Sequence, residues 1–260
     1  MRHARRQQLA RYAAQAKRAE RGRLRAILNG LLAFSFAGLL GYGGYQGIVH
    51  PETPLPPQWN PIEPLQISHP VTPLSGWKLN RAAADAASCL AALAGQATIE
   101  VLEPRNDSDQ CFIADRVNVD TVGHAQVASL ETRCAIALRM AMWEEHSLQP
   151  AAERIFGTSV TRIDHIGSYN CRQLRTVQGP SERMSTHATA DAVDITGFTF
   201  ADGRQLRLLE DWDSAGANAE FLRAARDGAC DWFELTLSPD FNALHADHFH
   251  LQSRGWGGCR

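Results

Sequence analysis

The longest apolar stretch of the chain runs from Ala26 to Val49 and contains no charged side chain. As an α-helix, these 24 residues would be about 36 Å long, which is enough to cross a hydrocarbon core of roughly 30 Å. Nine of the 25 residues before it are Arg or Lys, and such basic flanks stay on the cytoplasmic side of a membrane. The pattern predicts a basic cytoplasmic segment over 1–25 and a single-pass signal-anchor over 26–49 in the inner membrane. A cleaved secretory signal is the alternative, and it would export the rest of the chain as well.

Prolines dominate the segment that follows. Eight of the twelve prolines lie between Pro51 and Pro73. Proline fixes φ and removes a hydrogen-bond donor, so such a backbone is extended and semi-rigid. The sequence therefore predicts a stalk over 50–75, which carries a periplasmic globular domain over 76–260.

Apolar residues recur at helical spacing in the first half of this domain. Between Gln126 and His146, six apolar positions lie one, three or four residues apart, which predicts one long buried helix. Glycines mark two expected helix ends, at Gly95 and near Gly228. We expect helices over 80–93, 126–146, 151–156 and 219–225.

Alternating patterns with β-branched residues predict strands, most of them in the second half of the domain. Asp202-Gly203 lies between two such segments and predicts a hairpin turn, while Gly179-Pro180-Ser181 predicts a loop. Because helices come first and strands cluster later, the expected fold class is α+β, a small and mainly antiparallel sheet flanked by helices. We expect strands over 160–169, 192–200, the residues after the turn at 201–204, 232–237 and 247–252.

The charge of the domain argues against one class of partner. Residues 75–260 contain 17 basic and 25 acidic side chains. Contacts to phosphate groups need clustered positive charge, so nucleic-acid binding is not expected.

All six cysteines lie in the exported part of the chain. An even number of cysteines in an oxidising compartment predicts three disulfides, although six cysteines allow fifteen pairings. A preference for short loops, which close at smaller entropic cost, favours three sequential pairs. Buried free thiols are the alternative. The expected disulfides are Cys89–Cys111, Cys134–Cys171 and Cys230–Cys259.

Four residues in two short segments have the chemistry of a mononuclear zinc site. His187 and Asp194 lie in one segment, and His248 and His250 lie in the other. Imidazole nitrogen and carboxylate oxygen are ligands that zinc prefers, and a catalytic site keeps one position open. On a strand, residues two apart point to the same face, so one histidine could bind the metal while the other acts as a base beside it. A hydrogen-bonded polar cluster without metal is the alternative interpretation.

The same residues carry a resemblance to known families. Ser185-x-His187, Asp194 and Asp247-His248-x-His250 are similar to the Ser-x-His, Asp, His-x-His pattern of the LAS-type zinc peptidases, the group of lysostaphin, D-Ala-D-Ala and murein endopeptidases. Over about residues 85–260, the chain resembles the bacterial extensin-like C-terminal family in the segments SYNCR (168–172), STH (185–187), DITGF (194–198), DGR (202–204), FLR (221–223), GAC (228–230) and NALHADHFH (242–250).

The resemblance implies zinc bound by His187, Asp194 and His250, with His248 as the catalytic residue. Other polar residues near these motifs are expected to assist. Ser185 could hydrogen-bond a ligand or the substrate, Arg172 or Arg183 could hold a substrate carboxylate, and His245 and Asp247 are expected around the ligands rather than on the metal.

One position departs from the family pattern. Where the family usually has a Gly-Asn pair before the aspartate strand, this chain has Ala190-Asp191. The additional carboxylate could change metal affinity or act beside the ligands.

These features predict a membrane-anchored zinc metallopeptidase that cleaves peptide bonds in peptidoglycan stems or cross-links. The expected cofactor is Zn²⁺, and the expected partners are peptidoglycan and, through residues 26–49, the cytoplasmic membrane. A non-catalytic wall-binding module on the same fold and a scaffold protein without zinc are the alternatives.

Overall fold

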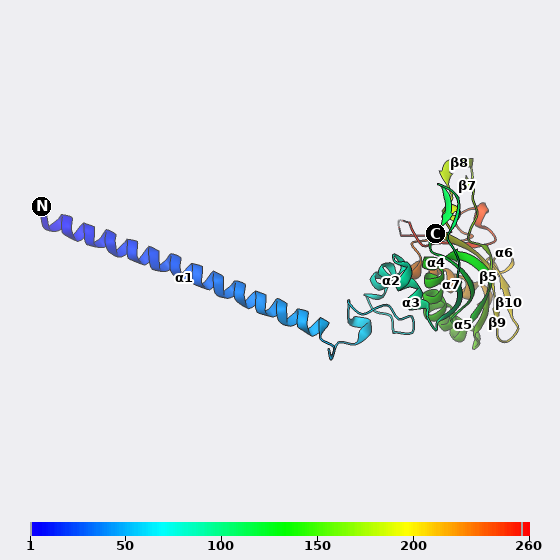
Figure 1. The fold of residues 1–260 in the computed structure, drawn as a ribbon, viewed down its shortest axis with the longest axis horizontal. Helices are drawn as coiled ribbons and strands as arrows, with labels where there is room; N and C mark the ends of the chain where they lie inside the picture. The colour runs from blue at the N-terminus through cyan, green and yellow to red at the C-terminus, as the bar shows by residue number, and fades with distance from the viewer. Residues whose placement is uncertain (1, 256) are drawn as a thin grey trace. The chain divides into compact units, whose positions relative to one another are not determined.

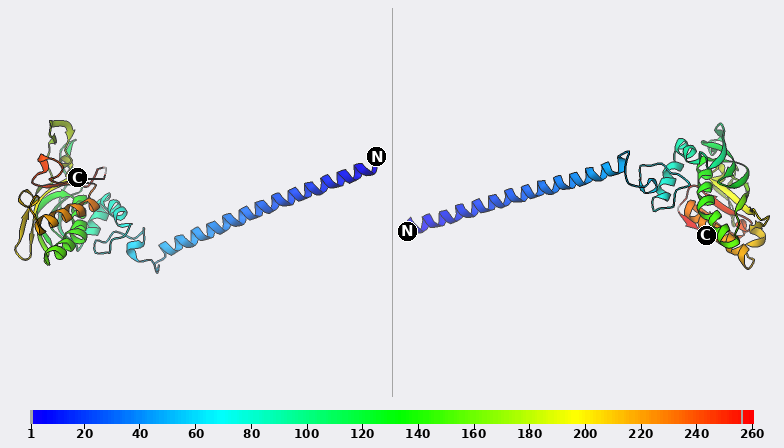
Figure 2. Two further views of the ribbon diagram at one scale, coloured as in Figure 1. Left: turned by 180° about the vertical axis from the view of Figure 1, so that it is seen from behind. Right: turned by 90° about the horizontal axis from the view of Figure 1, so that it is seen from below.

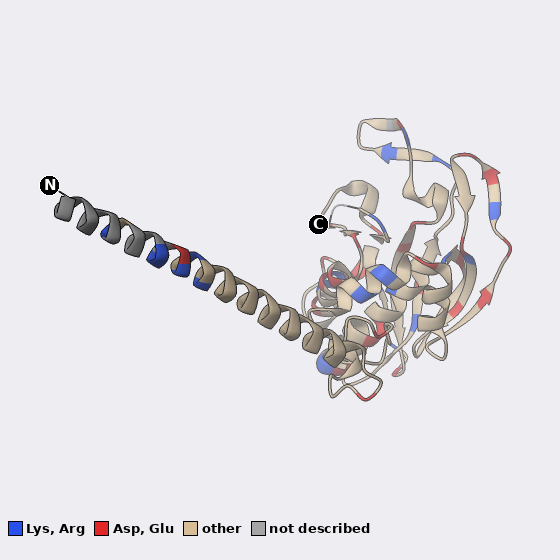
Figure 3. Ribbon diagram, turned by 60° about the vertical axis from the view of Figure 1, so that its left-hand side comes forward, with Lys and Arg blue, Asp and Glu red and all other residues tan. Residues whose placement is uncertain are grey.

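The computed structural model describes residues 2–255 and 257–260, and the chain divides into two units, Met1–Ile62 and Glu63–Arg260. The first unit consists mainly of helix α1 (Arg2–Val49), followed by the short 3₁₀ turn η1 (Pro57–Trp59). The part of this helix from Glu20 to Val49 is long and apolar enough to cross a membrane, by length and composition. In Figure 3 the charged positions of α1 end before its apolar half. The helix therefore has the features of an anchor or a signal.

The second unit, Glu63–Arg260, is referred to below as the globular unit. The strands of its main sheet are β1 (Ala97–Val101), β4 (Arg116–Val122), β5 (Ala125–Arg133), β6 (Val160–Gly167), β9 (Ala192–Phe200), β10 (Gln205–Arg207), β11 (Leu235–Leu237), β12 (Phe249–Gln252) and β13 (Gly258–Cys259). These nine strands run in the order β1-β4-β5-β6-β9-β12-β11-β13, with β10 paired to β9. Two pairings, β5 with β6 and β11 with β13, are parallel, and the others are antiparallel.

Two hairpins lie outside this sheet. The first is formed by β2 (Arg105–Ser108) and β3 (Cys111–Ile113), and the second by β7 (Gln173–Thr176) and β8 (Gly179–Met184). The β7–β8 hairpin projects from the body of the globular unit (Figure 1 and the left view of Figure 2). The helical elements are α2 (Ser75–Ala83), α3 (Ala86–Leu93), α4 (Cys134–Trp143), the π-helical turn η2 (Glu144–Leu148), α5 (Gln149–Phe156), η3 (Thr186–Thr189), α6 (Leu208–Asp211), α7 (Ala217–Trp232) and η4 (Ala243–His245).

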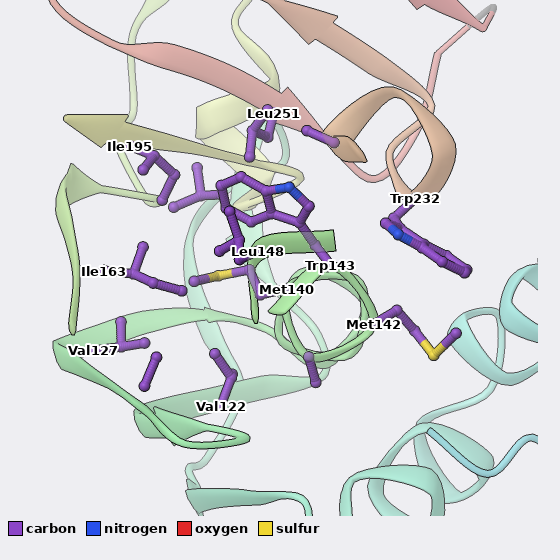
Figure 4. Packing of buried hydrophobic residues seen from close by; sticks show 14 of the residues in the cluster. Val122, Val127, Met140, Met142, Trp143, Leu148, Ile163, Ile195, Trp232 and Leu251 are labelled. Atoms are coloured by element: carbon purple, nitrogen blue, oxygen red, sulfur yellow. The ribbon is translucent and has the colours of Figure 1, made fainter. Parts of the chain in front are cut away.

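Helix α4 lies at the centre of the core. All ten of its residues are buried, and its apolar side chains pack against residues of the sheet (Figure 4). The indole ring of Trp143 meets the rings of Phe198 and Phe233 edge-on, at centroid distances of 5.8 Å and 6.2 Å. Arg139 is the one charged residue of helix α4. Its guanidinium donates a hydrogen bond to the carbonyl of Trp232 and forms an ion pair with Glu234. The same helix thus packs the core and supports the chain at the start of β11.

The fold class is α+β, as the sequence predicts, but the sheet has nine strands and is larger than expected. It is still mainly antiparallel, although the two parallel pairings make it a mixed sheet. The strand predicted over 192–200 coincides with β9, and the turn at Asp202-Gly203 leads into β10. The strand predicted over 160–169 is β6, which ends at Gly167. Those predicted over 232–237 and 247–252 correspond to β11 and β12, with later starts at Leu235 and Phe249.

The predicted long helix over 126–146 is wrong in its first third and helical in the rest, where α4 continues into η2. The first part of this segment is strand β5, and only Cys134–Trp143 forms helix α4. Ser129 has a positive φ of 34°, and the pairing of β4 with β5 shifts register there. This irregularity places the buried Val127 and Leu130 three residues apart, which is the spacing of a helix face.

The helix predicted over 80–93 is two helices. Asp85 lies between α2 and α3, and its carboxylate accepts a hydrogen bond from the Ser88 backbone N–H at 2.8 Å. This N-cap starts α3 in a new direction. The shorter helix predicted over 151–156 is α5, which begins two residues earlier at Gln149 with Pro150 in its first turn.

Two predictions based on glycine were wrong. Helix α7 does not end near Gly228 but continues to Trp232. Gly228 instead lies against Ser147, and a Cβ at this position would lie 2.4 Å from that side chain. The expected loop Gly179-Pro180-Ser181 forms the start of strand β8. The first glycine thus allows close helix packing, and the second begins a strand.

All six cysteines form disulfides, but two of the three predicted pairs are wrong. The structure pairs Cys89 with Cys134, Cys111 with Cys171, and Cys230 with Cys259, of which only the last was expected. The first two close loops of 45 and 60 residues. The packing of α3 against α4, rather than loop length, brings Cys89 to Cys134.

Part of the proline-rich segment belongs to the globular unit. Leu65 and Ile67 are buried in its core, with exposed fractions of 7% and 2%. The carbonyl of Ile67 also accepts a hydrogen bond from Nε2 of His146 at 2.7 Å. These contacts attach residues 63–74 to the core and to η2 of the globular unit. Any flexible spacer is therefore shorter than the predicted stalk over 50–75.

Ile67→Ala should therefore lower the free energy of unfolding by about 2–4 kcal/mol, because the substitution leaves a cavity in the core. Val71→Ala is the matched control in the same segment, since Val71 is 54% exposed and its truncation should change stability by less than about 0.5 kcal/mol. Denaturant unfolding followed by tryptophan fluorescence measures both. Equal effects of the two substitutions would mean that this segment does not contribute to the core.

A buried carboxylate in the π-helical turn predicts a pH effect on stability. Glu144 Oε1 accepts hydrogen bonds from the backbone N–H of His124 at 3.0 Å and from Gln149 Nε2 at 2.7 Å, whereas Oε2 has no partner among the described residues. Burial raises the pKa of Glu144 above its ordinary value of 4.5, although both hydrogen bonds oppose this shift. Gly123 leaves room for the group, since a Cβ there would lie 1.8 Å from Oε2.

Because folding raises its pKa, Glu144 keeps its proton to a higher pH in the native state than in the unfolded state. Its contribution to the free energy of unfolding therefore falls as pH rises above 4.5. Glu144→Gln cannot ionise, so its stability relative to the wild type should increase from acidic to neutral pH. Unfolding measured for both proteins across this range tests the prediction. A difference that is constant with pH would show that Glu144 titrates normally.

Candidate metal centre

The centre is built on two neighbouring strands. Asp194 of β9 and His250 of β12 are directly paired in the antiparallel ladder, so their side chains lie side by side on one face. His187 comes from the turn η3, which immediately precedes β9. His187 and Asp194 are therefore close in sequence, and strand pairing brings the distant His250 to them.

The three groups are close together and buried. Asp194 Oδ1 lies 2.8 Å from His250 Nδ1, and Asp194 Oδ2 lies 3.2 Å from His187 Nε2. The two imidazole nitrogens are 3.1 Å apart. The exposed fractions of His187, Asp194 and His250 are 3%, 8% and 8%. One ligand atom from each residue lies within 4.8 Å of the others, so the group could hold a metal ion.

The donor set fits zinc chemically. Two imidazoles and one carboxylate are the protein ligands of a common type of catalytic zinc site. His187 Nδ1 lies 2.7 Å from the carbonyl of Ser168, which accepts its N–H and leaves the lone pair of Nε2 facing the centre. On His250, Nε2 lies 2.6 Å from the side-chain amide of Gln252, so Nδ1 is the nitrogen that faces Asp194. Both rings are therefore held in orientations suited to metal binding.

Electrostatics keep the centre in the ionisation state that a metal requires. Burial opposes a charge on Asp194, but the adjacent imidazoles of His187 and His250 outweigh it and lower the pKa of this carboxyl group. Burial is also the largest effect on His250 and lowers its pKa, against the hydrogen bond to Asp194. A deprotonated carboxylate and a neutral imidazole are the forms that bind metal.

His248 lies beside the three groups but is held differently. Its Nδ1 is 2.7 Å from Asp247 Oδ1, and its Nε2 is 3.6 Å from Asp194 Oδ1. His248 precedes β12 rather than lying in it, yet its Nε2 still reaches the same side as His250. A histidine oriented by a carboxylate on one nitrogen, with the other nitrogen facing the centre, has the arrangement of a general base.

The remaining residues predicted around the ligands have distinct environments. His245 packs its ring against His248 and His250, at centroid distances of 5.2 Å and 5.8 Å, and its Nδ1 lies 2.8 Å from Asn242 Oδ1. Burial and the neighbouring histidines lower the pKa of His245 to about 4, so it is neutral at physiological pH. Ser185 accepts a hydrogen bond from the backbone N–H of His187 at 3.3 Å and so caps η3.

Asp191 does not approach the metal ligands. Its buried carboxylate forms ion pairs with Arg133 at 2.7 Å and with Arg254 at 3.0 Å, and it accepts a hydrogen bond from Thr189 at 2.5 Å. The preceding Ala190 has a positive φ of 50°, a conformation that glycine adopts at lower cost. Asp191 therefore ties together the loop before β9 and the segment after β12.

A cleft of about 1120 Å³ opens above the centre. His187, Asp194, His248 and His250 line it, together with the β7–β8 hairpin and the loop before β12. Arg172 and Arg183 also line it, which places both predicted arginines at the site. Two supporting residues, Ser168 and Gln252, were missed by sequence reasoning. The position of Gln252, two residues after His250 on the same strand face, could have indicated it, whereas nothing in the pattern marks the Ser168 carbonyl.

The fold and the site define an α+β domain with a buried His-Asp-His group at the base of a cleft. The family model described as "Extensin-like protein C-terminus" matches residues 87–260, and the chain belongs to this family. No curated protein and no solved structure matches the chain in the comparisons made. The apolar helix and the three disulfides together indicate a membrane-associated or extracytoplasmic location.

Proposed function

We propose that this protein is a membrane-anchored, zinc-dependent hydrolase that cleaves peptide bonds in peptidoglycan. The observation that carries the proposal is the buried His187, Asp194 and His250 group at the base of an open cleft, with His248 beside it. A structural zinc site is closed by four protein ligands, whereas three ligands next to a cleft are typical of a catalytic one.

Each residue has a defined task in this mechanism. His187, Asp194 and His250 would hold the zinc ion, which when bound would supply Lewis-acid chemistry and lower the pKa of water toward neutrality. His248 Nε2 accepts a proton from the water and returns it to the leaving amine, and Asp247 holds the ring in position at 2.7 Å. His245, neutral and packed on His248, limits the movement of that ring.

The compartment supports peptidoglycan as the substrate. Helix α1 would anchor the chain in the inner membrane with its basic end in the cytoplasm, and the disulfide-bonded globular unit would lie in the periplasm. Peptidoglycan lies above that membrane, and its stem peptides and cross-links offer amide bonds.

Digestion of purified sacculi with the full-length protein in detergent, followed by mass spectrometry of the released muropeptides, tests this function. We expect products that contain a newly cleaved peptide bond. His124→Ala is the control that should retain activity, because the exposed side chain of His124 is not among the residues that line the cleft. Binding to sacculi without any cleavage would favour the non-catalytic wall-binding module instead.

A further inference from the structure

Three arginines that line the cleft form no ion pair with a described carboxylate. In the globular unit, eleven arginines form ion pairs with Asp or Glu: 105, 116, 133, 139, 154, 162, 204, 207, 223, 226 and 254. Arg172, Arg175 and Arg183 form none with any described carboxylate, and all three line the cleft. These three guanidinium groups are thus without an ion-pair partner among the described residues, although acidic residues outnumber basic ones over 75–260.

These arginines belong to the projecting β7–β8 hairpin and the residue that leads into it. Arg175 lies on β7, Arg183 lies on β8, and Arg172 immediately precedes β7. Glu182, the acidic residue of β8, forms no ion pair with them in the described structure. The hairpin is therefore a cationic wall on one side of the cleft.

Arg172 is the member tied to the metal centre. Its carbonyl accepts a hydrogen bond from the Ser185 backbone N–H at 3.0 Å, two residues before His187. Its guanidinium is half-buried and donates to the Gln173 carbonyl at 3.2 Å. Burial and the charge of Arg175 lower the pKa of Arg172, while the Asp194 carboxylate raises it. Arg172 thus lies within electrostatic reach of both the metal ligands and the hairpin.

We propose that Arg172, Arg175 and Arg183 form a subsite that binds a carboxylate of the substrate next to the bond that is cleaved. A guanidinium binds a carboxylate through two parallel hydrogen bonds, which fixes orientation as well as charge. Phe241 and Leu244 are exposed on the loop before β12 and also line the cleft, so an apolar part of the peptide has its own contacts. The substrate is therefore an anionic peptide, and the hairpin determines its specificity.

This inference rests on the proposed function for the identity of the peptide, and two carboxylates of a peptidoglycan stem have the required chemistry. One is the free carboxylate at the end of the stem, and the other is a side-chain carboxylate within it. Binding of the first corresponds to a carboxypeptidase, and binding of the second to an endopeptidase.

Equilibrium binding of synthetic stem peptides to the full-length, zinc-loaded His248→Ala protein in detergent tests the subsite without turnover. Three peptides are compared: the unmodified peptide, one with its terminal carboxylate converted to an amide, and one with its side-chain carboxylates converted to amides. We expect one of the two amides to bind about 10- to 100-fold more weakly than the unmodified peptide. The amide that loses affinity identifies the carboxylate that is bound.

Arg172→Gln, added to this protein, should weaken binding of the unmodified peptide by a similar factor and leave binding of the weak amide unchanged. Arg172→Lys should restore part of the affinity, and Arg154→Gln, at an exposed position of helix α5 outside the cleft, should have no effect. Equal binding of all three peptides, or equal weakening of all by Arg172→Gln, would overturn the proposal. If the wild-type protein cleaves no peptidoglycan but binding still depends on a carboxylate, the proposed hydrolase activity is wrong and the subsite is supported.

Discussion

Replacing His250 or His187 with alanine is expected to abolish tight zinc binding and hydrolytic activity together. Each substitution removes one of three ligands, and in each variant the buried Asp194 also loses a neighbouring imidazole. Two remaining ligands do not make a tight zinc site. Metal content measured by mass spectrometry after dialysis gives the result, with His124→Ala as a control that should retain one zinc per chain.

The prediction separates the metal centre from a polar cluster. If the purified wild-type protein binds no zinc, the hydrogen-bonded cluster is the correct interpretation of the three residues. If either alanine variant keeps full zinc occupancy, that residue is not a ligand.

His248→Ala should retain zinc but lose activity by about 10²–10⁴-fold, which is the usual cost of removing a general acid-base group. The reason is geometric, since His248 Nε2 approaches Asp194 only to 3.6 Å while its Nδ1 is held by Asp247. Asp247→Asn should reduce the rate by a smaller factor, because the ring remains but its orientation and basicity change.

Metal analysis and rates of muropeptide release on the same preparations provide the measurement. Loss of zinc from His248→Ala would make His248 a fourth ligand, and a four-ligand site is typical of a structural role. Unchanged activity with retained zinc would exclude His248 from proton transfer.

The residues of the candidate site were predictable from sequence because their chemistry is local and distinctive. A His-x-His pair and an aspartate at the start of a β-branched segment are recognisable without knowing how strands pair. The sheet then places Asp194 opposite His250, so that the structure brings together the residues that the sequence grouped.

Features that depend on tertiary packing were harder to predict. The irregularity at Ser129 gave a strand the spacing of a helix, and tertiary packing, such as that of α3 against α4, decides which cysteines meet. Only part of the cationic wall could be predicted from the sequence, which indicated Arg172 and Arg183. Arg175 lies in no recognisable motif, and only the structure shows that it lines the cleft with the rest of the β7–β8 hairpin. Ile67 was placed in a stalk since its proline-rich surroundings concealed a core residue.

Because residues 63–74 are attached to the globular unit, the linker that remains limits how far this unit can lie from the membrane. Only the 13 residues from His50 to Ile62 remain between the end of α1 and this unit. Even fully extended, they would span no more than about 45 Å. Under the proposed topology, the protein would search for substrate by diffusing in the plane of the membrane, and the linker would lift the globular unit by no more than that distance. Lengthening this linker would extend its reach into the wall, but at the expense of the high local concentration that a short tether maintains.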